Sequence, residues 1–164
     1  MRAGAGALLV AALLAAGCGT PGGLPDPGPC PATPPALQGS PDTRTYINAV
    51  IAALDEFQDA DQDFRAAWPE RRFRDRSTFK EDFVEFQRRT ECLTNDIQAA
   101  GTPAGLETVV VDLQAFLALI NESIAMGAEA VESRNASAYR DWIREIDVLV
   151  VGYTDFQARL LAQR

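Results

Sequence analysis

The sequence predicts an all-α protein, an antiparallel up-down-up-down four-helix bundle behind a disordered Pro/Gly-rich tether. Three observations predict this fold. Apolar residues recur at steps of three and four in four segments of the region 42–164. Proline, glycine or capping residues separate these segments. The connections between them are short, which favours antiparallel neighbours.

The first helix is expected from about residue 42 to residue 68. The segment 40–42 (Ser-Pro-Asp) supplies start signals, and Pro69 ends the helix. Its apolar stripe comprises Ile47, Val50, Leu54, Phe57, Phe64 and Trp68. Asp61 interrupts this stripe, and a carboxylate that faces a core is costly unless it is paired. We expect Asp61 to turn to solvent or to meet a hydroxyl; the alternative is that it marks a functional site.

The second helix is expected to start at Thr78, where Thr78 and Glu81 have the spacing of a capping box, and to end at Gly101. Its apolar stripe is interrupted at Thr90. The residues of the stripe are Phe79, Phe83, Phe86, Leu93 and Ile97.

The third helix is expected to open at residues 102–103 (Thr-Pro), and residues 135–137 are expected to cap the fourth. The valine-rich runs 109–111 and 148–151 resemble strands locally, but the helical period around them lasts far longer than a strand. Gly127 falls inside the third helix, where we expect it to permit close helix packing. The two stripes comprise Leu106, Val110, Leu113, Leu117, Ile120, Ile124 and Val131, and Tyr139, Trp142, Ile146, Leu149, Tyr153, Phe156 and Leu160.

The N-terminus reads as a targeting segment. Arg2 precedes an uncharged apolar stretch over residues 7–16, whose helical length of about 15 Å is too short to span a bilayer. The run 13–18 (Leu-Leu-Ala-Ala-Gly-Cys) resembles the lipobox of bacterial lipoproteins. The resemblance implies that the Cys18 thiol is diacylated and that the chain is then cut just before it, although the usual leucine three residues earlier is Ala15. An ordinary secretory cleavage site, which would release a soluble protein, is the alternative.

The cysteine count agrees with lipidation. The chain has three cysteines, and modification of Cys18 leaves Cys30 and Cys92 as a pair in an oxidising, exported compartment. We therefore expect a Cys30–Cys92 disulfide, with two free thiols as the alternative. The expected organisation is a signal peptide over 1–17, a lipidated cysteine and linker over 18–41, and the bundle over 42–164.

Composition excludes several function classes. The net charge of −8 argues against binding to nucleic acid or to an anionic membrane through bulk charge. The chain has no histidine, which excludes Ser-His-Asp and Cys-His catalysis and the Glu-x-x-His ligands of di-iron bundles. We expect no catalytic residues, no bound metal and no cofactor, and hence a protein that is not an enzyme.

Residues 19–41 contain eight prolines and five glycines, a composition that prevents both helix and packed strand. We expect this tether to leave the bundle at the end that holds the 101–103 turn and the C-terminus, nearest the membrane. The 69–77 connection and the 132–137 turn would then share the distal end. The protein is expected to be exported and lipid-anchored to the cell membrane or outer membrane, facing the periplasm or exterior.

A basic stretch accompanies the 69–77 connection. Its cations reverse the charge locally in an otherwise acidic chain. Together with two aromatic residues they have the composition of binding hot spots. They are Arg65, Arg71, Arg72, Arg74, Arg76 and Lys80, with Trp68 and Phe73. We expect this surface to bind an acidic protein or a polyanionic envelope polymer; the alternative is a solvated connection whose charge is neutralised by Glu70, Asp75 and Glu81.

An acidic run offers a second function. The residues Asp59, Asp61 and Asp63, followed by Glu70, have the spacing of an EF-hand calcium loop, but Phe64 occupies the position that needs glycine. Two functions therefore stand. The favoured one is a non-enzymatic binding or structural module in the envelope. The alternative is a cation- or small-ligand-binding module, or a carboxylate-based hydrolase, that uses the run 59–70.

Overall fold

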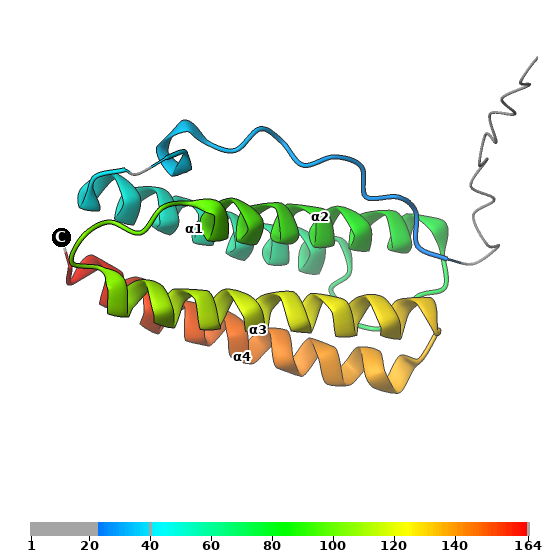
Figure 1. Ribbon diagram of the computed structural model, residues 1–164. Helices are drawn as coiled ribbons and strands as arrows, with labels where there is room; N and C mark the ends of the chain where they lie inside the picture. The colour runs from blue at the N-terminus through cyan, green and yellow to red at the C-terminus, as the bar shows by residue number, and fades with distance from the viewer. Residues whose placement is uncertain (1–22, 40, 164) are drawn as a thin grey trace, which may run out of the picture.

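The computed structural model describes residues 23–39 and 41–163, so the predictions for the signal peptide and Cys18 lie outside the described residues. It is all-α, as predicted. The four helices are α1 (Thr43–Ala67), α2 (Ser77–Ala99), α3 (Glu107–Glu132) and α4 (Ala136–Leu161). They run alternately up and down, and each packs beside its sequence neighbours, while α4 closes the ring against α1 (Figure 1).

Two of the four helix starts follow the predicted capping chemistry. The Asp42 carboxylate accepts a hydrogen bond from the Thr45 backbone N–H at 3.0 Å. The Asn135 side-chain oxygen accepts from the backbone N–H groups of Ser137 and Ala138, both at 3.1 Å. These acceptors satisfy backbone donors that have no partner within the helix, which stabilises its first turn.

The other two helix starts differ from the prediction. The capping box at Thr78 is wrong, because α2 begins one residue earlier and its N-cap, Arg76, makes no side-chain cap hydrogen bond. The third helix begins at Glu107 rather than at residues 102–103, because a turn in which Gly105 has a φ of +87° intervenes. Glycine adopts this left-handed conformation without steric cost, so the turn delays the helix.

The predicted apolar stripes form one core. Its end near the 69–77 connection is built from aromatic rings, and Trp142, 1% exposed, contacts the rings of Phe64, Phe83, Phe86 and Tyr139. Gly127 packs directly against Trp142: a Cβ atom added there would lie 2.6 Å from the indole Cε2. The prediction that this glycine permits close helix packing is confirmed.

The two polar interruptions of the stripes are buried. Thr90 is fully buried, and its hydroxyl donates to the Phe86 carbonyl of the preceding turn at 2.9 Å. Asp61 is 5% exposed and neither turns to solvent nor meets a hydroxyl, so that expectation is wrong. It pairs instead with an arginine one turn further along α1, as described below.

Residues 23–39, here called the strap, lie along α2 and do not extend away from the bundle (Figure 1). The Cys30–Cys92 disulfide is present, as predicted. Leu37 is buried in the core, and the partly buried Leu24 packs against the core. The strap contains a single 3₁₀ turn, Pro35–Leu37, so the absence of long helix or strand agrees with its composition, while its free extension does not.

The direction of the strap corrects the expected orientation. The Gly101 N–H donates to the Gly39 carbonyl at 3.1 Å, at the end where α1 begins. Further back along the chain, Thr33 donates to Asp96 at 2.6 Å and Cys30 bonds to Cys92. Each step towards the N-terminus is thus a step towards the start of α2. The strap therefore begins at the end that holds the 69–77 connection, not at the opposite end (Figure 1).

Two surface features concern α3 and the end of the bundle at which α1 begins. By length and composition alone, α3 is the one described helix apolar enough to cross a membrane, with a mean hydropathy of 1.6, and in the bundle it supplies core residues.

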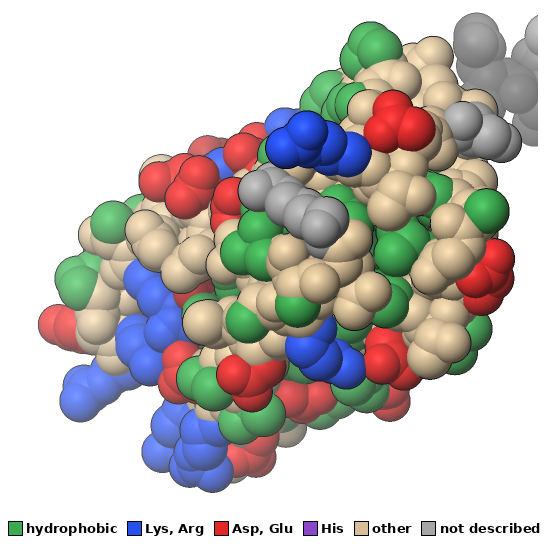
Figure 2. All heavy atoms as spheres, turned by 90° about the vertical axis from the view of Figure 1, so that its left-hand side faces the viewer, with side chains coloured by type: hydrophobic (Ala, Val, Ile, Leu, Met, Phe, Trp, Pro, Cys, Tyr) green, Lys and Arg blue, Asp and Glu red, His purple; other side chains and the backbone are tan. Residues whose placement is uncertain are grey.

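Figure 2 views the end at which α1 begins. Side chains of both charges and apolar side chains are interspersed over most of its visible surface, and Lys and Arg side chains gather at the lower left of the view.

Candidate functional site

The candidate site is the segment 68–76, here called the basic loop, which connects α1 to α2. Pro69 lies two residues past the end of α1 and has no N–H to continue the helix. The Trp68 indole packs edge-on to Phe79 with ring centroids 5.1 Å apart, and its Nε1–H donates to the Asp82 carboxylate at 3.0 Å. The start of the basic loop is therefore held on α2.

The middle of the basic loop is held by a second aromatic residue. The Phe73 ring is half-buried and lies 5.7 Å from the Phe79 ring and 6.1 Å from the Tyr139 ring, measured between centroids. We predicted that Phe73 binds a partner. In the structure its ring packs against Phe79 and Tyr139 of the protein itself. Its burial fixes the backbone from which the neighbouring arginines project.

The basic loop surrounds a hollow of about 280 Å³. Five of the six predicted binding residues line it, Phe73 being the exception, and the full lining is Trp68, Pro69, Glu70, Arg71, Arg72, Arg74 and Arg76. The sequence stretch thus lines one hollow that is open to solvent, where Arg72 and Arg76 are exposed. A pocket with several guanidinium groups suits an anionic group, because each guanidinium offers charge-assisted hydrogen bonds.

The four arginines of the hollow differ in their partners. Arg74 pairs with Glu70, four residues earlier. Arg71 contacts α4, where its Nη2 donates to the Asp147 carboxylate at 2.7 Å. Arg72 and Arg76 are exposed, and neither forms an ion pair with any residue that the structure describes. These two are the cations of the hollow that remain available to a ligand.

Arg71 belongs to a four-residue ion cluster that ties the basic loop to α1 and α4. Arg65 lies between two carboxylates, with Nε 2.5 Å from Asp61 and Nη1 2.8 Å from Asp147. Arg71 adds a second cation on Asp147 and a hydrogen bond to the Ile143 carbonyl at 3.3 Å. The cluster is neutral overall, and it satisfies the charge of Asp61 in the core.

The pKa values of the two carboxylates in the cluster are shifted in opposite directions. Burial raises the pKa of Asp61 against the opposing effect of the Arg65 hydrogen bond. At Asp147 partial burial also acts to raise the pKa, but hydrogen bonds from Arg71 and Arg65 outweigh it and leave the pKa lowered. The buried Tyr139 hydroxyl nearby has its pKa raised by desolvation. These pKa shifts are those of side chains packed around an ion cluster inside the protein. We therefore assign Arg71 a structural role in this cluster and do not count it among the groups free to bind a ligand.

The acidic run 59–70 does not form a calcium loop. The aspartates of the run all lie within the continuous helix α1, so their oxygens do not converge on one point. Asp61 pairs with Arg65, Asp63 with Arg89 of α2, and Glu70 with Arg74. Within the described residues, no group of three or more potential ligands is arranged to hold a metal ion.

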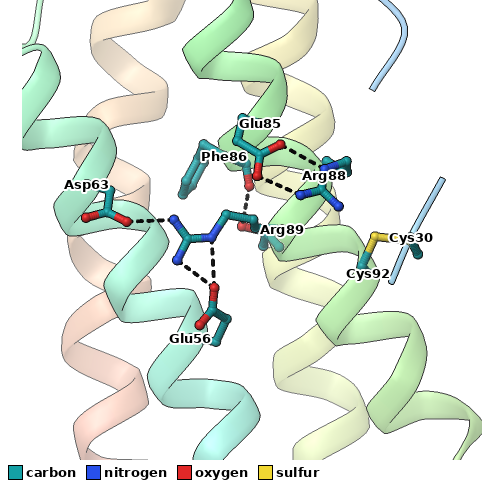
Figure 3. A network of polar contacts seen from close by, with 9 residues as sticks. Cys30, Glu56, Asp63, Glu85, Phe86, Arg88, Arg89 and Cys92 are labelled. Carbon is teal, nitrogen blue, oxygen red and sulfur yellow. Dashed lines mark hydrogen bonds and ion pairs between the residues drawn. A yellow bond between two sulfur atoms is a disulfide. The ribbon is translucent and has the colours of Figure 1, made fainter. Parts of the chain in front are cut away.

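Arg89 forms a second ion cluster between α1 and α2 (Figure 3). Its Nε and Nη2 reach the Glu56 carboxylate at 2.8 and 2.5 Å, while Nη1 reaches Asp63 at 2.7 Å. The preceding residue, Arg88, pairs with Glu85 one turn earlier on α2, and the Cys30–Cys92 disulfide lies on the strap side of α2 (Figure 3). Every charged group in this cluster has a partner, so it serves to join α1 to α2.

No protein-family model, curated protein or solved structure matches the chain.

Proposed function

We propose that this chain is an exported, lipid-anchored protein whose bundle is a non-enzymatic binding module, and that the basic loop is its binding surface. Two features support the location. The Cys30–Cys92 disulfide is typical of an oxidising compartment outside the cytosol. The N-terminal run ending at Cys18 resembles a lipobox, and its two acyl chains would give stable anchoring where one would not.

One observation carries the binding proposal: Arg72 and Arg76 project from a loop that is fixed on an aromatic platform, and neither has an ion-pair partner in the described part of the chain. Because the backbone is already held, a ligand need not order it, which lowers the entropic cost of binding. Trp68 supplies an apolar wall beside these cations. Arginine and tryptophan around a shaped hollow are the residue types that dominate binding hot spots, and the charge selects an anionic partner.

The binding proposal is tested by co-purification after cross-linking in the native envelope. The double variant Arg72→Glu, Arg76→Glu should lose the partner that the wild type captures, and circular dichroism should stay helical. The charge control is Arg44→Glu, Arg159→Glu, which changes the net charge equally on the other half of the bundle and also breaks the Arg159–Asp112 pair. Arg71 and Arg74 are left unchanged because both have internal partners. Equal capture by the two double variants would refute the proposal.

Anchoring is tested separately with labelled palmitate. The wild type should incorporate the label, and Cys18→Ala should not, because the acyl acceptor is the Cys18 residue. Equal incorporation by the two proteins would show that Cys18 is not the site of lipidation.

A further inference from the structure

The strap brings the chain upstream of residue 23 to the same end of the bundle as the basic loop. Three contacts fix this direction: Gly39 to Gly101, Thr33 to Asp96 and Cys30 to Cys92. Continued past Cys30, the strap reaches Leu24, which packs against the core, and it ends beside the 69–77 end in Figure 1. The disulfide holds the strap on α2 at Cys92, and the Leu24 contact holds it beyond that point.

The remaining distance to the proposed anchor is short. Five residue steps separate Cys18 from Gly23. A fully extended chain spans at most about 3.5 Å per residue, so the start of the strap lies within roughly 18 Å of the acylated cysteine. We infer that the basic loop faces the membrane that anchors the protein, and that its partner is the anionic headgroup surface of that membrane. This inference rests on the lipid anchoring proposed above.

The charges at this end fit a headgroup surface. The carboxylates of the basic loop are already occupied, Glu70 by Arg74 and Asp75 by both Lys80 and Arg134. Because these carboxylates are paired elsewhere, they do not compete with lipid phosphate for the exposed guanidinium groups.

Three arginines at this end have no ion-pair partner among the described residues: Arg72, Arg76 and, in the second turn of α4, Arg140. Each arginine near an anionic bilayer contributes about fivefold to its attraction. Trp68 lies among them, and tryptophan favours the boundary between headgroups and hydrocarbon because its ring is apolar and its N–H is polar.

The other end offers much weaker complementarity. Residues 90–133, which include the whole of α3, contain no lysine or arginine. Where α1 begins, Arg44 is accompanied by the carboxylates of Asp42, Asp96 and Glu107, and Arg159 is paired with Asp112. The orientation set by the strap and the charge distribution thus select the same end.

The experiment reconstitutes the mature lipidated protein, which begins at Cys18, with acylation verified by mass, in vesicles of phosphatidylcholine alone or with phosphatidylglycerol. Energy transfer from tryptophan to a dansyl headgroup reports the approach of the basic loop, since both tryptophans lie in this half of the bundle. In phosphatidylglycerol vesicles we expect strong transfer that falls in high salt, because screening shortens to about 3 Å at 1 M. Arg72→Gln, Arg76→Gln should lower the docking equilibrium about 25-fold, two charges at about fivefold each.

The control Arg44→Gln, Arg159→Gln should keep the wild-type transfer, and in phosphatidylcholine all three proteins should agree. Equal transfer for the wild type and the Arg72, Arg76 variant in phosphatidylglycerol would overturn the inference while leaving anchoring intact. Absence of any lipid on the wild-type protein would overturn both. Capture of an acidic protein that depends on Arg72 and Arg76, with transfer indifferent to phosphatidylglycerol, would assign the basic loop to a protein partner instead.

Discussion

Gly127 provides the sharpest test of the packing, because two glycines in neighbouring helices make opposite predictions. A Cβ atom at Gly127 would lie 2.6 to 2.9 Å from three atoms of the Trp142 indole. That indole is 1% exposed and held by four surrounding rings, so it has no free space into which it could shift. A Cβ at Gly152 would lie 3.5 Å from Phe116, an ordinary contact.

The magnitudes follow from two opposing effects. Replacing a helix-interior glycine by alanine gains about 1 kcal/mol from backbone propensity. Overpacking a well-filled core costs about 1–3 kcal/mol. Gly152→Ala should therefore raise the free energy of unfolding by about 1 kcal/mol, because only the propensity effect applies. Gly127→Ala should lower it by about 1 kcal/mol, since the clash outweighs the gain.

Urea denaturation followed by far-ultraviolet circular dichroism, with the disulfide intact, measures both variants. A third protein with Trp142→Phe shows whether the clash is responsible, because the smaller ring should make Gly127→Ala less costly than it is in the wild type. If Gly127→Ala is as stable as Gly152→Ala, the close contact between α3 and α4 at the indole is refuted.

Three further outcomes are expected. Replacing Cys30 and Cys92 by alanine should lower the free energy of unfolding by about 4 kcal/mol, the chain-entropy effect of opening a loop of 62 residues; an unchanged urea midpoint would contradict it. Arg65→Ala should cost about 3 kcal/mol because it leaves the buried Asp61 carboxylate without its partner. Arg72→Ala, at an exposed position, should change the free energy of unfolding by less than about 0.5 kcal/mol. A similar loss of stability in Arg65→Ala and Arg72→Ala would refute the structural role of Arg65 and the exposed role of Arg72. Millimolar calcium should leave the melting temperature unchanged, whereas a rise would restore the cation-binding alternative.

The helices could be predicted because their information is local. Apolar residues at steps of three and four continue through the valine-rich runs, and Asn135 caps α4 through its nearest neighbours. The start of α3 could not be placed, because Thr102–Pro103 has the composition of a helix start while Gly105 keeps the chain in a turn.

The ion cluster depends on residues far apart in the chain. Asp147 lies outside the acidic run and the basic stretch, and no short-range pattern connects it to Arg65 or Arg71. Only the packing of α4 against α1 brings them together. The same packing turns Arg71 from a candidate binding residue into a structural contact, which the sequence stretch alone does not reveal.

The course of the strap also escaped prediction. Proline and glycine give no periodic signal, so the composition of residues 23–39 indicates what the segment does not form and not where it lies. Leu24 and Leu37, two isolated apolar residues, attach it to the core, and the disulfide fixes its position between them. Its direction then reverses which end of the bundle faces the proposed anchor.

The most direct test of this orientation is a pair of distances in the intact protein. Spin labels carried by non-canonical residues leave the Cys30–Cys92 disulfide undisturbed, and can be placed at position 24 with either position 72 or position 44. Double electron–electron resonance should give a short, narrow distance distribution between positions 24 and 72, and a clearly longer one between positions 24 and 44. A shorter distance from position 24 to position 44 would contradict the account, because the chain would then enter at the end away from the basic loop.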